Sequence, residues 1–72
     1  MDEHTIKAAS DILYFIRSQR STTEFQMKPY LIMQGLQEFR YKMAINLLLS
    51  ESLISKSNHV GEVLYNITNE GE

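Results

Sequence analysis

The chain has 72 residues, of which 43% are hydrophobic, and it contains no cysteine. This length predicts one small domain, the hydrophobic content excludes a disordered chain, and the missing cysteine excludes disulfide bonds and thiolate zinc sites. The net charge of −2 disfavours nucleic acid, but four of the nine acids lie at the two ends of the chain. Residues 4–69 hold seven Lys or Arg against five acids, a balance of +2. Such a body can bind phosphates where its cations cluster.

The first predicted helix covers about residues 5–19. Apolar residues recur there at three- and four-residue spacing, which is typical of one buried helical stripe. The stripe consists of Ile6, Ala9, Ile12, Leu13 and Ile16, and it is widened by Tyr14 and Phe15. The polar run at residues 20–23 interrupts this pattern and ends the helix.

The segment after this run permits more than one interpretation. Pro29 inside a helix would remove one backbone hydrogen bond, but proline is well accepted at the first helical position. This favours a short second helix over residues 29–34. The alternative is a helix that begins near Thr22 and is kinked at Pro29, and residues 22–27 are also compatible with a short strand.

Gly35 marks the end of this second helix, because glycine readily adopts the positive φ angle that closes a helix. A third helix is predicted over residues 36–52, and it is apolar on two sides. One stripe consists of Tyr41, Ile45, Leu48 and Ser52, and the nearly opposite side carries Phe39, Met43 and Leu47. A helix this wide in a small domain must bury its second face under a hairpin or against another chain.

A β-hairpin is predicted over about residues 54–67. Residues 58–62 supply the turn, and the next residues follow a period of two, with Val63, Tyr65 and Ile67 on one face of a strand and Leu64 and Asn66 on the other. No apolar run approaches the roughly 20 residues of a membrane span, and the acidic start of the chain argues against a secretory signal. We therefore expect a cytoplasmic protein without membrane contact.

The second half of the chain carries three short motifs in a fixed order. They are Gly35-Leu36 at a turn, the spaced set Ile45, Leu48, Ser52, Leu53 and Ile54, and the set Tyr65, Ile67, Thr68 and Gly71 in a returning strand. With these motifs the chain resembles the winged helix-turn-helix DNA-binding regulators of bacteria, archaea and their viruses and plasmids. The resemblance implies an α+β fold, a winged helix-turn-helix domain spanning residues 1–72 in which three helices precede a hairpin wing.

The resemblance also implies a function, namely sequence-specific binding of double-stranded DNA by a small regulator of the repressor type, as a homodimer. The helix at 36–52 would enter the major groove, and the wing would contact the backbone. The candidate DNA contacts are Gln37, Glu38, Arg40, Lys42 and Asn46 on the helix, with Lys56, Asn58 and His59 at the wing. Side chains of these types contact bases or phosphates.

The apolar residues Phe39, Met43 and Leu47 support an alternative function. A winged-helix module without DNA binding could use this face against a protein partner or a second copy, and the same residues are also compatible with a core packed on both sides. His4 and His59 lack a third ligand at metal spacing, and no nucleophile lies in a pattern with a base. We therefore expect neither an enzyme nor a metal or cofactor site.

Overall fold

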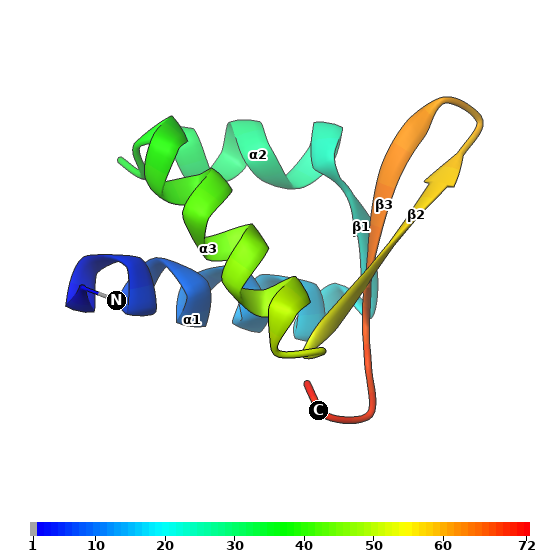
Figure 1. Cartoon of the computed structure of the whole chain (residues 1–72). Helices are drawn as coiled ribbons and strands as arrows, with labels where there is room; N and C mark the ends of the chain where they lie inside the picture. The colour runs from blue at the N-terminus through cyan, green and yellow to red at the C-terminus, as the bar shows by residue number, and fades with distance from the viewer. Residues whose placement is uncertain (1) are drawn as a thin grey trace.

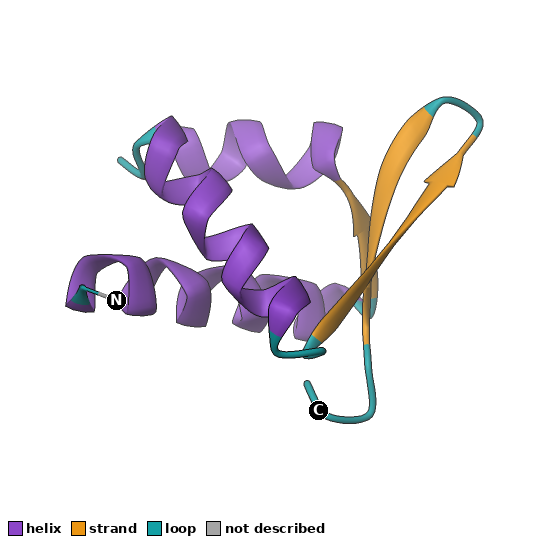
Figure 2. Ribbon diagram, viewed as in Figure 1, coloured by secondary structure: helices purple, strands orange, loops and turns teal. Residues whose placement is uncertain are grey.

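The computed structural model describes residues 2–72, so Met1 of the predicted domain lies outside the described residues. The elements follow the order α1 (Glu3–Gln19), β1 (Ser21–Thr23), α2 (Glu24–Met33), α3 (Glu38–Ser50), β2 (Ile54–His59) and β3 (Glu62–Ile67). The strands form an antiparallel sheet in the order β1-β3-β2, and the hairpin of β2 and β3 extends away from the helices (Figure 1; Figure 2). This small α+β domain is compatible with a winged-helix layout.

Helix α1 begins before residue 5 because Asp2 caps it. The Asp2 Oδ1 atom accepts the backbone N–H of Thr5 at 2.7 Å, which satisfies one of the free donors of the first turn. The buried stripe of α1 consists of Thr5, Ala8, Ala9, Ile12 and Ile16. The predicted burial of Ile6 and Tyr14 is wrong, since their side chains are 52% and 70% exposed. Ile6 lies about 100° around the helix from Thr5, which takes it off the buried stripe.

The favoured second helix over residues 29–34 is wrong, and the alternative beginning near Thr22 is closer to the structure. Thr23 caps α2, because its Oγ1 accepts the backbone N–H of Gln26 at 3.1 Å. Strand β1 precedes this cap because its backbone pairs with β3, a long-range contact that local sequence does not encode. Pro29 lies within α2 at an exposed position, where water can replace the missing backbone hydrogen bond.

Helix α3 begins at Glu38 rather than at residue 36, because the preceding residues close α2. Gly35 adopts a φ of 103°, as its place in the sequence predicts. The backbone N–H groups of Gly35 and Leu36 donate to the carbonyl oxygens of Ile32 and Leu31. This pair of hydrogen bonds is a Schellman motif, so Leu36 belongs to the end of one helix and not to the start of the next.

The end of α3 uses the same device with a less suitable residue. Ser52 adopts a φ of 60°, and the N–H groups of Ser52 and Leu53 donate to the carbonyl oxygens of Leu49 and Leu48. The predicted helical end at residue 52 is therefore two residues too late, since Ser50 is the last helical residue.

The predicted hairpin at residues 54–67 is confirmed, but the predicted turn over residues 58–62 is too long, because Asn58, His59 and Glu62 pair within the strands. Strands β2 and β3 pair from Ile54 opposite Ile67 to His59 opposite Glu62. Only Val60 and Gly61 remain for the turn, and both have positive φ angles, of 53° and 79°. A two-residue turn with two positive φ angles matches the twist of the strands it joins.

The core lies between the helices and the sheet, and a shared carboxylate joins three elements at its edge. Tyr41 of α3 and Tyr65 of β3 are buried, and their hydroxyl groups donate to Glu24 Oε1 of α2 at 3.2 Å and 3.3 Å. Burial, followed by the nearby Glu24 carboxylate, raises the pKa of Tyr65 to about 12 and the pKa of Tyr41 well above its usual value. Both phenols therefore remain protonated donors in the folded protein at neutral pH.

The last residues of the chain fold back onto the junction of α3 and β2. Thr68 Oγ1 donates to the Ser52 carbonyl oxygen at 2.6 Å and accepts the Gly71 backbone N–H at 3.2 Å. The Arg17 guanidinium donates to the Gly71 carbonyl oxygen through Nε at 3.0 Å and Nη2 at 2.9 Å. Gly71 lies so close to Leu53 that a Cβ atom there would overlap the Leu53 carbonyl oxygen. Thr68 and Gly71 therefore have a structural role in this chain.

We expect Gly71→Ala to destabilise the domain by about 1–3 kcal/mol, because the added methyl group forces the closing segment away from Leu53. Urea denaturation followed by circular dichroism measures this change. Asn69→Ala is the control, since Asn69 is exposed in the same turn and its loss should change stability by less than about 0.5 kcal/mol. Equal stability of the two variants would show that the close contact at Gly71 is not needed.

We also expect a loss of stability at alkaline pH that depends on Tyr65. The unfolded chain ionises this phenol near its reference pKa of 10.0, whereas the folded chain holds the proton until about pH 12. Stability is therefore full below pH 10 and decreases as pH rises toward 12, by on the order of 2 kcal/mol for this group. Urea denaturation from pH 9 to 12 should show a weaker pH dependence for Tyr65→Phe. Tyr14→Phe, at an exposed position, should keep the wild-type dependence.

Candidate nucleic-acid interface

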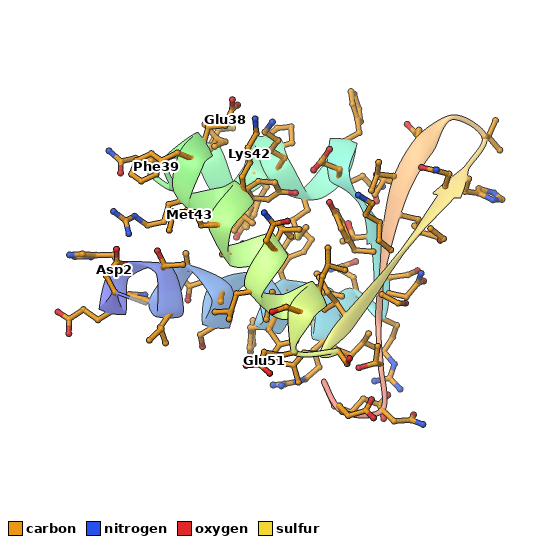
Figure 3. The ribbon with its side chains drawn as sticks, viewed as in Figure 1. Asp2, Glu38, Phe39, Lys42, Met43 and Glu51 are labelled. Atoms are coloured by element: carbon orange, nitrogen blue, oxygen red, sulfur yellow. The ribbon has the colours of Figure 1, made fainter. Side chains whose placement is uncertain are left out.

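The outward face of α3 is the first part of the candidate site. Tyr41, Ala44, Ile45 and Leu48 are buried and fix which side of the helix faces the core. The opposite side presents Phe39, Lys42, Met43 and Asn46, all of them exposed. Figure 3 shows Phe39, Lys42 and Met43 on the N-terminal half of α3. This face combines two apolar side chains with one cation and one amide.

The three residues predicted as a partner face do not share one environment. The Phe39 and Met43 side chains are 53% and 42% exposed. Leu47 is half-buried and packs against the core. The exposed apolar surface of α3 is therefore formed by Phe39 and Met43.

Arg40, a predicted DNA contact, is held by the start of α1. Its Nη1 atom forms an ion pair with Asp2 Oδ1 at 2.9 Å and donates to Thr5 Oγ1 at 3.1 Å. Only 20% of the Arg40 side chain is exposed. The guanidinium carbon also lies 5.0 Å from the centre of the Phe39 ring. Arg40 therefore contacts α1 and Phe39 rather than extending into solvent.

Two other predicted contacts lie at the start of α3. Glu38 pairs with Lys28 of α2 at 3.2 Å, and the same ammonium group lies 5.8 Å from the centre of the Tyr41 ring. Gln37 is the N-cap of α3, but its side chain makes no capping hydrogen bond and is exposed. The negative charge of Glu38 is thus offset by Lys28, and the Gln37 amide is available to a ligand.

The hairpin carries the remaining predicted contacts. Lys56, Asn58 and His59 of β2 are all exposed. Lys56 is paired with Tyr65, whose hydroxyl group reaches α2, and paired residues share one face of a sheet. Side chains alternate along a strand, so Lys56 and Asn58 lie on the face toward the helices and His59 lies on the other face.

The Lys and Arg side chains form two groups, according to whether each has a partner within the protein. Of the seven Lys and Arg residues, Lys7, Arg20, Lys28 and Arg40 form ion pairs, and Arg17 binds a backbone carbonyl group. Within residues 2–72, Lys42 and Lys56 have no such partner. They lie on the outward face of α3 and on the hairpin. This distinction is not visible in the sequence, because Arg40 and its partner Asp2 are 38 positions apart.

A hollow of about 510 Å³ lies between α1 and the turn that joins α2 to α3. Its lining includes the polar residues His4, Lys7, Asp11 and Arg40 together with the apolar residue Leu31. The Lys7 ammonium forms an ion pair with Asp11. Arg40 forms an ion pair with Asp2, which does not line the hollow, so both cations are already neutralised. Among the described residues, no group of three or more His, Cys, Asp or Glu is arranged to hold a metal ion.

Comparison with family models, curated proteins and solved structures gives no match for this chain. In the part of the chain that the structure describes, no helix has the length and apolar character needed to cross a membrane. Any assignment of function therefore depends on the geometry and charge of the chain itself.

The ion pair between Asp2 and Arg40 leads to a prediction about stability at acid pH. Hydrogen bonding from Thr5, first from its backbone N–H and then from its side chain, followed by the Arg40 guanidinium, lowers the pKa of Asp2 from 3.8 to about 2. Its contribution to stability is therefore present above pH 3.8 and is lost as pH falls toward 2. Asp2→Asn keeps a good capping side chain but removes the charge. We expect this variant to have a lower Tm than the wild type at pH 6.

The same variant should also lose part of the acid dependence. Thermal unfolding at several pH values between 2 and 6 should show a smaller change in Tm for Asp2→Asn than for the wild type. Asp11→Asn is the control, because its ion pair with Lys7 is exposed and such pairs contribute little to stability. An identical dependence of Tm on pH for Asp2→Asn and the wild type would contradict a stabilising ion pair between Asp2 and Arg40.

Proposed function

We propose that the domain is a winged helix that binds double-stranded DNA, with α3 in the major groove and the β2–β3 hairpin beside it. The observation that carries this proposal is the location of the two Lys or Arg side chains that, among residues 2–72, have neither an ion pair nor a hydrogen bond within the protein. Lys42 lies on the outward face of α3 and Lys56 lies on the hairpin. A lysine without an internal ion pair can bind a phosphate without losing a contact within the protein, and these two lie on the elements that would contact a duplex.

The shape of the domain supports the same proposal. Helices α2 and α3 are joined by a short turn at Gly35, and α3 keeps one long side free of contacts with the core. The hairpin extends beyond the helices (Figure 1). A helix with one free side can enter the major groove, which is about 12 Å wide, while a protruding hairpin contacts the adjacent backbone.

The proposed contacts follow from which side chains are free. Asn46 and Gln37 would face the base edges in the groove, Lys42 would contact a phosphate at the rim of the groove, and Lys56 and Asn58 would face the backbone from the hairpin. Asparagine can form two hydrogen bonds with adenine, and lysine can bind guanine or phosphate. We leave out Arg40 and Glu38, because each is engaged by a residue of another helix. His59 lies on the other face of the hairpin and has a secondary role at most.

The small number of cationic side chains available to phosphates limits how tightly one copy of the domain can bind DNA. Two phosphate contacts correspond to a slope of about −1.8 in a plot of log K against log salt concentration. Because two phosphate contacts give weak binding, we propose that two copies bind neighbouring half-sites as a homodimer, which would double this slope. A dimer that occupies a promoter would act as a small cytoplasmic repressor, by binding and without catalysis.

Fluorescence anisotropy of a labelled random duplex, measured at several salt concentrations, tests this proposal. We expect a slope near −1.8 for one bound copy or near −3.6 for two. Lys42→Ala and Lys56→Ala should each weaken binding and reduce the slope by about 0.9 per bound copy. Lys7→Ala is the control, because Lys7 lies on α1 in an ion pair with Asp11. Binding that does not depend on salt, or no binding at all, would contradict the proposal.

A further inference from the structure

We propose that Phe39 and Met43 recognise thymine through its C5-methyl group, so that the preferred duplex carries thymines opposite the N-terminal half of α3. This inference rests on the proposed function, because it requires α3 to lie in the major groove. It goes further by assigning the exposed apolar side chains to a base and by naming the chemical group they contact. The thymine methyl group is the apolar feature of the major-groove edge of a base pair.

The geometry of α3 brings the two side chains together on its outward face. Phe39 and Met43 are four residues apart, so they are neighbours on one side of the helix, with Cβ atoms about 5–6 Å apart. Their exposed fractions of 53% and 42% leave both side chains accessible to a ligand. Base pairs are stacked about 3.4 Å apart. The two side chains can therefore contact methyl groups that are one or two base steps apart.

The Phe39 ring is oriented by its neighbour. The Arg40 guanidinium lies 5.0 Å from the ring centre, and Asp2 and Thr5 hold this guanidinium in place. A cation over the face of an aromatic ring is a favourable contact. This contact restricts the rotation of the exposed ring, and a ring that is already oriented loses less conformational entropy when it binds.

The mixture of side chains on this face matches the major groove of DNA. Lys42 and Asn46 are exposed beside the apolar pair. Asn46 can form hydrogen bonds with a base edge, the apolar pair can contact the thymine methyl group, and Lys42 can contact a phosphate. Protein–protein interfaces are enriched in phenylalanine and methionine but depleted in lysine, so Lys42 is the residue that favours DNA.

The test compares thymine with uracil, which differs only by the absence of the methyl group. A preferred site is first selected from a random duplex library with the wild-type protein. Each thymine of that site is then replaced by deoxyuridine, and binding is measured by anisotropy at constant salt. We expect one or more replacements to weaken binding by about three- to fivefold per methyl group lost. This comparison changes only the DNA, so it does not depend on how a variant folds.

Variants of Phe39 and Met43 then test whether these residues cause the preference for thymine over uracil. Phe39→Ala and Met43→Ala should each bind thymine and uracil sites more equally, while their salt slopes stay at the wild-type value. Tyr14→Ala is the control, because it removes an aromatic side chain that is 70% exposed on α1, and it should keep the full preference for thymine. The variant Lys42→Ala should instead reduce the salt slope and keep the preference.

The outcomes separate this inference from the proposed function. Salt-dependent binding with equal affinity for thymine and uracil would overturn only the inference. A preference for thymine that persists in both Phe39→Ala and Met43→Ala would also overturn it, because other residues would then be responsible. The absence of salt-dependent binding to any duplex would overturn both proposals and would favour a protein partner for this face.

Discussion

The Glu24 carboxylate accepts hydrogen bonds from the hydroxyl groups of Tyr41 and Tyr65, and it thereby joins α2, α3 and β3 at the edge of the core. A domain of this length has a small apolar core, so directional contacts of this kind contribute strongly to a single arrangement. They set the position of α3 relative to the strand that carries the hairpin. The relative position of the outward face of α3 and the hairpin, and hence the proposed DNA surface, depends on this network.

The charges of the chain are organised by ion pairs between elements. Asp2 on Arg40 ties the start of α1 to α3, Lys28 on Glu38 ties α2 to α3, and Arg20 on Glu72 ties the end of α1 to the last residue. Together with the Lys7–Asp11 pair within α1, these contacts neutralise four of the seven cations. Each ion pair removes one positive and one negative charge, so pairing leaves the net charge at −2 and changes only where the unpaired charges lie. Among residues 2–72, the cations without an acidic partner are Lys42 on α3, Lys56 on the hairpin and Arg17 on α1, which binds a backbone carbonyl group.

The exposure of the apolar residues on the outward face of α3 follows from how this helix packs on the core. A helix with apolar residues on two sides can bury only one of them when it lies on the surface of a small domain. Tyr41 directs its own side inward, because its hydroxyl group binds Glu24. Phe39 and Met43 are then left facing outward, beside Lys42. The exposure of this pair thus follows from the choice of buried face and not from the composition of the helix.

Several elements can be predicted from the sequence because they depend on local chemistry. The amphipathic first helix, the glycine turn at residue 35 and the hairpin at 54–67 all follow from periodicity and turn residues, which act over a few positions. Other features depend on distant partners and arise only from tertiary packing. Strand β1 exists because β3 pairs with it, and α2 extends across Pro29 because Thr23 caps it beside that strand. The environment of Arg40 was decided in the same way, since its partner Asp2 comes near only when α1 packs against α3.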